Sequence, residues 1–292
     1  MHMMPPGAAQ LPRLRRQPME IRALKSGLLT GLAWLITLVG SVPLFSVIYM
    51  LAAEGGSRIS FETLTALPPA GFETGGGFGN AIIGTLVMVA IATVISLPIG
   101  LLAAVYLAVL GPFSQLARVA RFVAKTLTGF PSILAGVFTY GILVVSFGYS
   151  ALAGGVALAV LMLPTIVLAA EEAMKEVPQK MKDAAYGMGC TRSQVIWRVV
   201  IPTGLPGILT GVMLAVAGAA GESAPLLFTA LFSNYYLSNL MEPTASLSIL
   251  IYNFSAMPFE NQIELAWTAS LVLVLIVLVF NILARLVGQP KV

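Results

Sequence analysis

The chain has 292 residues, of which 58% are hydrophobic and only 10% charged, and its mean hydropathy is +0.93. Because a soluble domain carries about 25% charged residues, this composition excludes a water-exposed fold and predicts an all-α membrane protein. The net charge of +4 does not indicate a nucleic-acid partner, since the basic residues occur in short runs beside apolar stretches. With one cysteine, Cys190, and one histidine, His2, the sequence offers no disulfide, no Cys/His metal cluster and no Ser-His or Cys-His catalytic pair within the membrane.

Six apolar stretches are long enough to cross a bilayer, which takes about 20 helical residues. The tail of residues 1–26 is basic, and the stretch after it is too long for a cleaved signal peptide. We expect one transmembrane domain over residues 27–292. Its spans are predicted at about 27–51, 80–110, 128–147, 151–170, 207–232 and 263–287. The segment 244–254 is apolar but too short to span, and two interpretations stay open: a partial helix on the outer face, or a segment that simply packs against the bundle.

The basic residues lie on one side of these spans. Of the sixteen lysines and arginines, all but Arg58 fall in the tail, in the loops 111–127 and 171–206, or at the end of the last span and beyond it. The positive-inside rule makes that side cytoplasmic. We therefore expect a multi-pass protein with both termini in the cytoplasm.

The loop 171–206 is the longest cytoplasmic connection. The run Asp183-Ala184-Ala185 predicts a short helix that begins at Asp183, because a carboxylate suits a positive helix N-terminus, and the alanines give it a smooth face. Gly189 can supply the turn that ends this helix. A second helix, about 193–200, leads to Pro202 and Pro206, after which the chain continues as span five. The pattern favours a small surface helix exposed to a cytoplasmic partner.

This loop resembles the EAA loop of ABC-importer permeases, E-A-A-x3-G-x9-I-x-L-P, with Asp183 in place of Glu, Val199 in place of Ile and Ile201 in place of Leu. Other runs are similar to the PstA family of phosphate permeases. These runs are residues 131–136, 163–167, 206–212, 221–227 and 266–285. The resemblance covers roughly residues 80–287.

The resemblance implies a MetI-like type I ABC importer permease core, formed by spans two to six, that carries inorganic phosphate by alternating access. It implies a bacterial or archaeal plasma membrane. The partners implied are a PstC-like second permease, two PstB-like ATPases and a PstS-like phosphate-binding protein outside. Coupling to the ATPase is expected to involve Asp183, Ala184, Ala185, Gly189 and Pro202. No G-x-x-x-x-G-K-[ST] phosphate loop occurs, so the chain is not expected to hydrolyse ATP, and no cofactor is expected.

Glu222 is the only acidic residue inside an expected span. A charge at the bilayer centre costs about 2.5–3.5 kcal/mol on insertion scales, so we expect Glu222 to face the bundle or a water-filled cavity. Gly211, Ala215, Gly218, Glu222 and Thr229 recur at helical spacing and form one small or polar face. Such a face permits close helix approach.

Two interpretations of this face stay open. The functional one places five residues on the translocation path: Gly218, Glu222, Ser223, Pro225 and Thr229. In the structural one, Glu222 ties two helices together by pairing across their interface. An anionic Glu repels phosphate, so we expect it to pair with an arginine of the partner permease or to be protonated. Pro225 cannot donate to the Gly221 carbonyl, which predicts a kink or hinge.

One departure from the family concerns positive charge. PstA-like sequences commonly carry an Arg one helical turn before this Glu, where this chain has Gly218. The groups that stabilise a bound anion are then expected to come from the partner permease, helix N-termini or hydroxyls. The candidate hydroxyls are Ser132, Ser223 and Thr229, which could instead satisfy helix backbone.

Other interpretations also stay open. The chain could be an ABC permease for molybdate, sulfate or an amino acid, or a structural or signalling membrane subunit. A membrane enzyme would need clustered Asp, His or Ser-Lys groups in the spans, where only Glu222 occurs. Arg118, Arg121 and Lys125 lie at helical spacing and form a basic face for lipid phosphates or for the ATPase.

Overall fold

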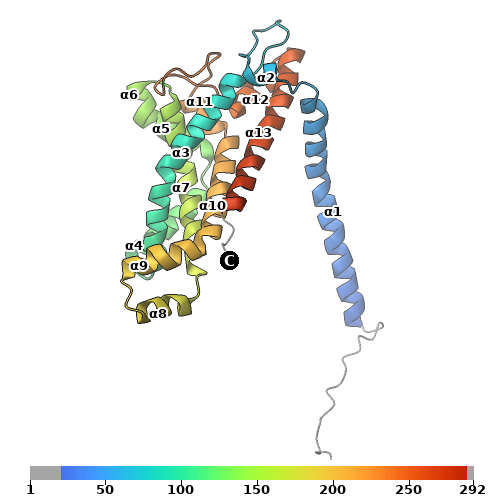
Figure 1. Ribbon diagram of the computed structural model, residues 1–292. Coiled ribbons are helices and arrows are strands. Elements are labelled where there is room, and N and C mark those ends of the chain that lie inside the picture. The colour runs from blue at the N-terminus through green and yellow to red at the C-terminus, as the bar shows by residue number, and fades with distance from the viewer. Residues whose placement is uncertain (1–20, 288–292) are drawn as a thin grey trace, which may run out of the picture. The chain divides into compact units, whose positions relative to one another are not determined.

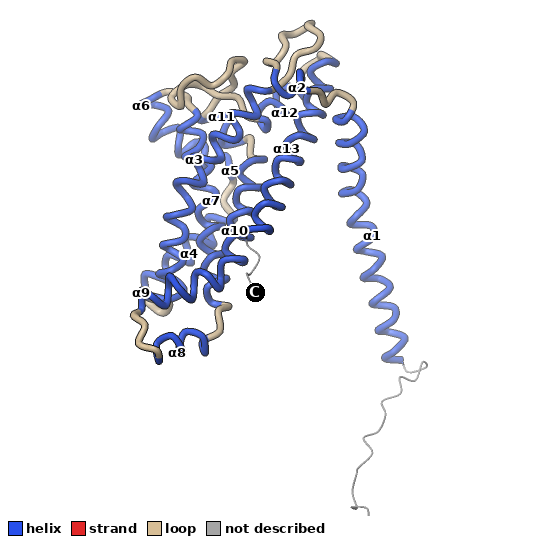
Figure 2. Tube along the Cα trace, viewed as in Figure 1, coloured by secondary structure: helices blue, strands red, loops and turns tan. Residues whose placement is uncertain are grey.

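The computed structural model describes residues 21–287, and this range is helical with no strand (Figure 2). The chain divides between Met50 and Leu51 into two units. The predicted tail lies outside the described residues up to position 20, as does Lys291. The helical elements are α1 (Ile21–Gly56), α2 (Phe61–Thr65), α3 (Gly79–Val105), η1 (Tyr106–Leu110), α4 (Gln115–Thr128), α5 (Ser132–Thr139), η2 (Tyr140–Val144), α6 (Val145–Phe147), α7 (Ala151–Lys175), α8 (Gln179–Gly187), α9 (Arg192–Val195), η3 (Ile196–Val200), α10 (Ile201–Gly221), α11 (Ala224–Thr229), α12 (Leu247–Ser255) and α13 (Glu260–Val287).

The helices account for the six predicted spans. Within the described range, five helical runs are long and apolar enough to cross a membrane, and a bent pair makes a sixth if it is counted as one span. The bent pair is α4 with α5–α6, at an angle of 106°. Span three was predicted to start at Thr128, but that residue ends α4 and the membrane helix starts at Ser132. Gly129 and Pro131 explain the break, because a proline disfavours helical backbone in the residue before it.

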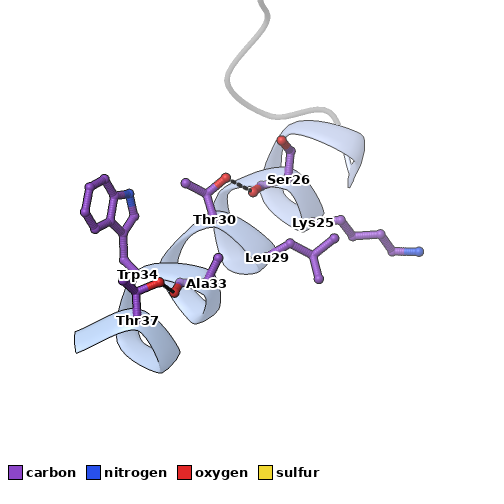
Figure 3. A pocket seen from close by; sticks show the side chains of 7 residues that line it. All are labelled: Lys25, Ser26, Leu29, Thr30, Ala33, Trp34 and Thr37. Atoms are coloured by element: carbon purple, nitrogen blue, oxygen red, sulfur yellow. Dashed lines mark hydrogen bonds between the residues drawn. The ribbon is translucent and has the colours of Figure 1, made fainter. Parts of the chain in front are cut away.

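The first span is one long helix, α1, with Pro43 inside it. A shallow hollow runs along its first turns, and Figure 3 shows that every side chain lining it comes from this one helix. The hydroxyls of Thr30 and Thr37 each donate to the carbonyl four residues earlier, at 2.8 Å. These polar groups are satisfied within α1, as a helix in lipid requires.

Span five differs most from its prediction. The surface helix predicted at 193–200 is continuous with the span, so that α9, η3 and α10 run unbroken from Arg192 to Gly221. The predicted continuous helix to residue 232 is wrong, because the helix ends at Gly221 and α11 starts at Ala224. Pro225 lies in the first turn of α11, where its missing N–H has no partner to lose. The expected kink at Pro225 is therefore a full break just before it.

The core of the second unit is built from α3, α7 and α10. Their contacts use small residues: a Cβ placed on Gly100 would lie 2.7 Å from Ile166 Cγ2, and one on Gly211 would lie 2.3 Å from Ala169 Cβ. Helices in lipid gain little from the hydrophobic effect and associate mainly through such close packing. The predicted small face of span five is confirmed at Gly211, which packs against α7.

The loops gather at two ends of the bundle (Figure 1). The helices α4, α8 and α9 lie at one end, whereas α2, α6 and α12 lie toward the other. The predicted partial helix at 244–254 exists as α12, which buries Leu247, Ile249 and Leu250 in the bundle while Tyr252 and Ser255 stay exposed. Its first backbone N–H, from Leu247, donates to Thr85 Oγ1 of α3 at 2.8 Å, which holds α12 against the bundle.

Candidate coupling loop and translocation pocket

The coupling loop begins with α8, which starts four residues before the predicted position. Pro178 precedes the helix, and Gln179 is its first residue. Asp183 therefore lies in the middle of α8, where its carboxylate accepts a hydrogen bond from Gln179 Nε2 at 2.9 Å. The predicted role of Asp183 at the helix N-terminus is wrong, because proline at 178 already sets the start of the helix.

The turn predicted at Gly189 is confirmed. Its φ is +84°, in the left-handed region that favours glycine. Cys190 N–H donates to Ala185 O at 3.1 Å, and Gly189 N–H donates to Tyr186 O at 2.9 Å. This pair of hydrogen bonds is the Schellman arrangement, which satisfies two carbonyls at the end of α8 and sends the chain into α9.

The predicted coupling residues divide into two groups. Ala185 is only 2% exposed and packs in the same core cluster as Val195 and Ile196, so it seats α8 on the helix that follows. Asp183 and Ala184 are exposed on the other side. Pro202 is exposed at the start of α10. The loop thus exposes Asp183 and Ala184, while Ala185 packs α8 against the helix that follows.

A pocket of about 270 Å³ opens where the predicted translocation residues Gly218 and Glu222 lie. Its walls come from the end of α4, the start of α5, the middle of α7 and the end of α10. The lining residues are Leu127, Thr128, Phe130, Ser132, Leu161, Met162, Thr165, Leu214, Ala215, Gly218, Ala219 and Glu222. A Cβ on Gly218 would meet nothing within 4 Å, so this part of the helix faces open space.

The other three predicted path residues lie elsewhere. Ser223 lines a separate hollow with Ser248, on the side of α12 and α13. Thr229 is fully buried, and its hydroxyl donates to Pro225 O at 2.8 Å, so it satisfies helix backbone. Pro225 is buried against Gly136 of α5. The break after Gly221 separates them from Glu222, since a continuous helix would have kept one face.

The break itself is held by a hydrogen bond from another helix. Glu222 has extended backbone, with ψ of 121°, and Ser248 Oγ donates to its carbonyl at 3.0 Å. Irregular backbone at membrane depth is tolerated only where its polar groups find such partners inside the protein. Ser248 therefore helps to fix the backbone that positions the Glu222 side chain at the pocket.

A buried acid, Glu171, was missed by the sequence analysis. Span four was predicted to end at Ala170, but α7 continues to Lys175 and buries the Glu171 side chain to 4% exposure. Arg121 Nε and Lys175 Nζ each lie 2.5 Å from Glu171 Oε1. The spacing of Glu171 and Lys175 is a local signal that could have indicated the pair. Arg121 turns inward, so the basic face predicted on α4 consists of Arg118 and Lys125.

The polar side chains of the described residues indicate which kinds of site this part of the chain can form. Among residues 21–287, no group of three or more His, Cys, Asp or Glu side chains is placed to hold a metal ion. The pocket combines one carboxylate and three hydroxyls with a lining that is otherwise mostly apolar.

Comparison with known proteins agrees with this architecture. Residues 96–290 match the family model for the inner membrane component of binding-protein-dependent transport systems. The chain is 39% identical to the phosphate transport system permease protein PstA of Pasteurella multocida, over 92% of this chain and 96% of that protein. It is 40% identical to PstA of Haemophilus influenzae, over 90% and 94% of the two chains. It is also 40% identical to a probable PstA of Methanocaldococcus jannaschii, over 88% and 92%.

Solved structures show the same fold at lower sequence identity. A chain of the inward-facing MetNI methionine ABC transporter superposes with a TM-score of 0.56 and 21% identity, covering 73% of this chain and 93% of that one. A chain of a bacterial alginate ABC transporter, solved in complex with its alginate-bound periplasmic protein, gives a TM-score of 0.65 at 15% identity, covering 94% and 100%. With its membrane helices and its long matches to these relatives, the chain belongs to the inner membrane components of binding-protein-dependent transport systems, and among them to the PstA-type phosphate permeases.

Proposed function

We propose that this chain is the membrane-spanning permease subunit of an ATP-driven importer that carries inorganic phosphate across a bacterial or archaeal plasma membrane. The observation that carries the proposal is the identity of 39–40% to phosphate permeases of two bacteria and an archaeon along most of each chain. The sequence has no ATP-binding phosphate loop, so the energy is supplied by separate ATPase subunits.

The proposed orientation follows from charge. Arg118, Lys125, Lys182 and Arg192 belong to α4, α8 and α9 at one end of the bundle, whereas Arg58 lies between α1 and α2 and pairs with Glu264 of α13. Basic loops stay in the cytoplasm, so the end with α8 is cytoplasmic. Both chain termini are then cytoplasmic, and the end with α2 faces outward.

The proposed partners follow from this orientation. A PstB-like ATPase pair docks on α8, where Asp183 and Ala184 are exposed. A PstC-like second permease closes the pocket at Glu222 from the other side. A PstS-like phosphate-binding protein delivers the anion at the outer end, and lipid covers the remaining apolar helix faces.

Transport requires an energy source because phosphate is an anion. Each negative charge that enters against an inside-negative potential costs about 2.3 kcal/mol per 100 mV. In the proposed cycle, ATP-driven closure of the ATPases draws the two coupling loops together and opens the pocket outward. Hydrolysis then lets the loops separate, and the pocket opens to the cytoplasm.

Within the pocket, Ser132 and Thr165 are the proposed hydroxyl donors to phosphate oxygens. Glu222 repels the anion, so its proposed partner is an arginine of the second permease. Gly218 leaves space beside it for that arginine, since a Cβ there would have no neighbour within 4 Å. The two permeases together thus form a site that neither completes alone.

A substitution on the exposed face of α8 tests the docking. In the Ala184→Arg variant, we expect the ATPase to be lost from the purified complex while the second permease stays bound, because the bulky charge lies on the docking face. Ser255→Arg, at the exposed last residue of α12, is the control and should keep the ATPase. An ATPase that remains bound to Ala184→Arg with full phosphate uptake would contradict the proposal.

A further inference from the structure

The cytoplasmic end of α3 leaves several carbonyls without helical partners. The helix passes into the π-helical turn η1, which ends at Leu110. Gly111 N–H donates to Tyr106 O at 2.9 Å and satisfies one carbonyl. The last carbonyls of any helix lack intrahelical donors and need them from elsewhere. In this chain the donors are two arginines, Arg121 from the next helix, α4, and Arg192 from α9.

Arg192 is the first of these donors. Its Nη2 donates to Val109 O at 2.6 Å and to Leu110 O at 2.7 Å. Arg121 is the second, and its Nη2 and Nη1 donate to Leu107 O at 2.7 Å and Pro112 O at 2.9 Å. We call Arg121 and Arg192 the arginine cap of α3. A cation is favourable at a helix C-terminus because the carbonyls there carry partial negative charge.

The position of Arg192 in its own helix shows that α9 does not explain it. Arg192 opens α9, directly after the N-cap Thr191. A positive charge in the first turn opposes the helix dipole, so it does not stabilise α9. Among the described residues Arg192 forms no salt bridge, and its side-chain hydrogen bonds go to the end of α3. Its contacts therefore join the coupling loop to α3.

This connection adds a second route from α8 into the bundle. The first route is the chain itself, because α9, η3 and α10 are one continuous helix. The second crosses 83 residues of sequence from Arg192 to Val109. From there α3 packs along α7 through contacts such as Gly100 with Ile166.

We infer that Arg192 is a positioning residue that makes the end of α3 follow the coupling loop, so that movement of α8 shifts two spans together. The inference rests on the proposed function, since it assumes that an ATPase moves α8. Arg121 anchors the same corner from inside through Glu171, at 2.5 Å. Arg192 is exposed, so it can be changed without opening the core.

The transport test uses the full importer complex in proteoliposomes and measures phosphate moved per ATP hydrolysed. In Arg192→Met, we expect this ratio to fall by about tenfold while ATP hydrolysis continues, because two charge-assisted hydrogen bonds are lost. Arg192→Lys keeps a donor and a charge and should recover part of the ratio. Arg198→Met removes an exposed arginine of η3 and should leave the ratio unchanged. An unchanged ratio in Arg192→Met overturns the inference.

A distance measurement tests the same inference without changing Arg192. Spin labels at Phe113→Cys, after the end of α3, and Met188→Cys, at the end of α8, occupy positions that are 93% and 79% exposed. Cys190→Ser removes the native thiol. We expect the distance between the labels to stay constant when ATP binds. A distance that changes with nucleotide overturns the inference, and absence of any ATPase from the unaltered complex refutes the proposed function and the inference with it.

Discussion

Gly136 allows the closest approach between α5 and the broken span, and its substitution tests that geometry. A Cβ on Gly136 would lie 2.6 Å from Pro225 Cα and 2.9 Å from Pro225 O. Both atoms are backbone, so α11 must retreat by roughly 0.8 Å to restore the 3.4 Å of ordinary contact. Because α11 follows directly after Glu222 and Ser223, this retreat also displaces the end of the pocket.

The expected magnitude comes from comparison with Gly141, which lies in the same helical run but would place a Cβ in open space. Replacing a helical glycine by alanine stabilises by about 0.5–1 kcal/mol, and Gly141→Ala should show that gain. Gly136→Ala has the same gain but also an overpacking cost of about 1–3 kcal/mol. The two variants should therefore differ by about 1–3 kcal/mol in free energy of unfolding.

The assay is thermal unfolding of the purified complex in detergent, followed by phosphate uptake after reconstitution. At about 2–4 °C per kcal/mol, Gly136→Ala should melt several degrees below Gly141→Ala. Uptake should fall in Gly136→Ala and stay unchanged in Gly141→Ala. Equal melting temperatures for the two variants would refute the close contact between α5 and α11.

Three further substitutions test other parts of the structure. Glu171→Gln leaves Arg121 without its carboxylate and should lower the free energy of unfolding by about 1–3 kcal/mol. This loss is smaller than for a fully buried ion pair, because Arg121 and Lys175 are both partly exposed. An unchanged melting temperature in thermal unfolding would contradict a stabilising role of this ion pair. Gly189→Ala forces alanine to a φ of +84° at a cost of about 1–2 kcal/mol and should weaken ATPase co-purification, whereas Gly187→Ala, in open space, should not. Glu222→Gln should lower phosphate uptake in an assembled complex, and normal uptake with normal assembly would rule out both interpretations of this residue.

The spans could be predicted because each depends on local composition. A run of about 20 apolar residues has few alternatives to a membrane helix, whatever its neighbours are. The turn at Gly189 was predictable for a similar reason, since its conformation is set within the six residues 185–190. Local signals were less reliable for helix boundaries, as Pro178 and Asp183 show. Both residues favour a helix start, and the structure uses the earlier one.

Tertiary contacts were not predictable from the sequence. Pro225 signals a disturbance in span five, but the position of the break depends on Ser248 reaching the Glu222 carbonyl from 26 residues away. Arg121 and Arg192 looked like surface charges, because their acceptors lie in other segments. The grouping of Ser223 and Thr229 with Glu222 was incorrect for the same reason, as it assumed an unbroken helix.

ATP-dependent phosphate uptake by the complete complex in proteoliposomes tests the central claim most directly. With the binding protein outside and ATP inside, labelled phosphate should accumulate against its gradient, and excess sulfate or molybdate should not compete. Omitting ATP should abolish the accumulation. Equal uptake without ATP, or uptake displaced by sulfate or molybdate, would contradict the assignment of this chain to an ATP-driven phosphate importer.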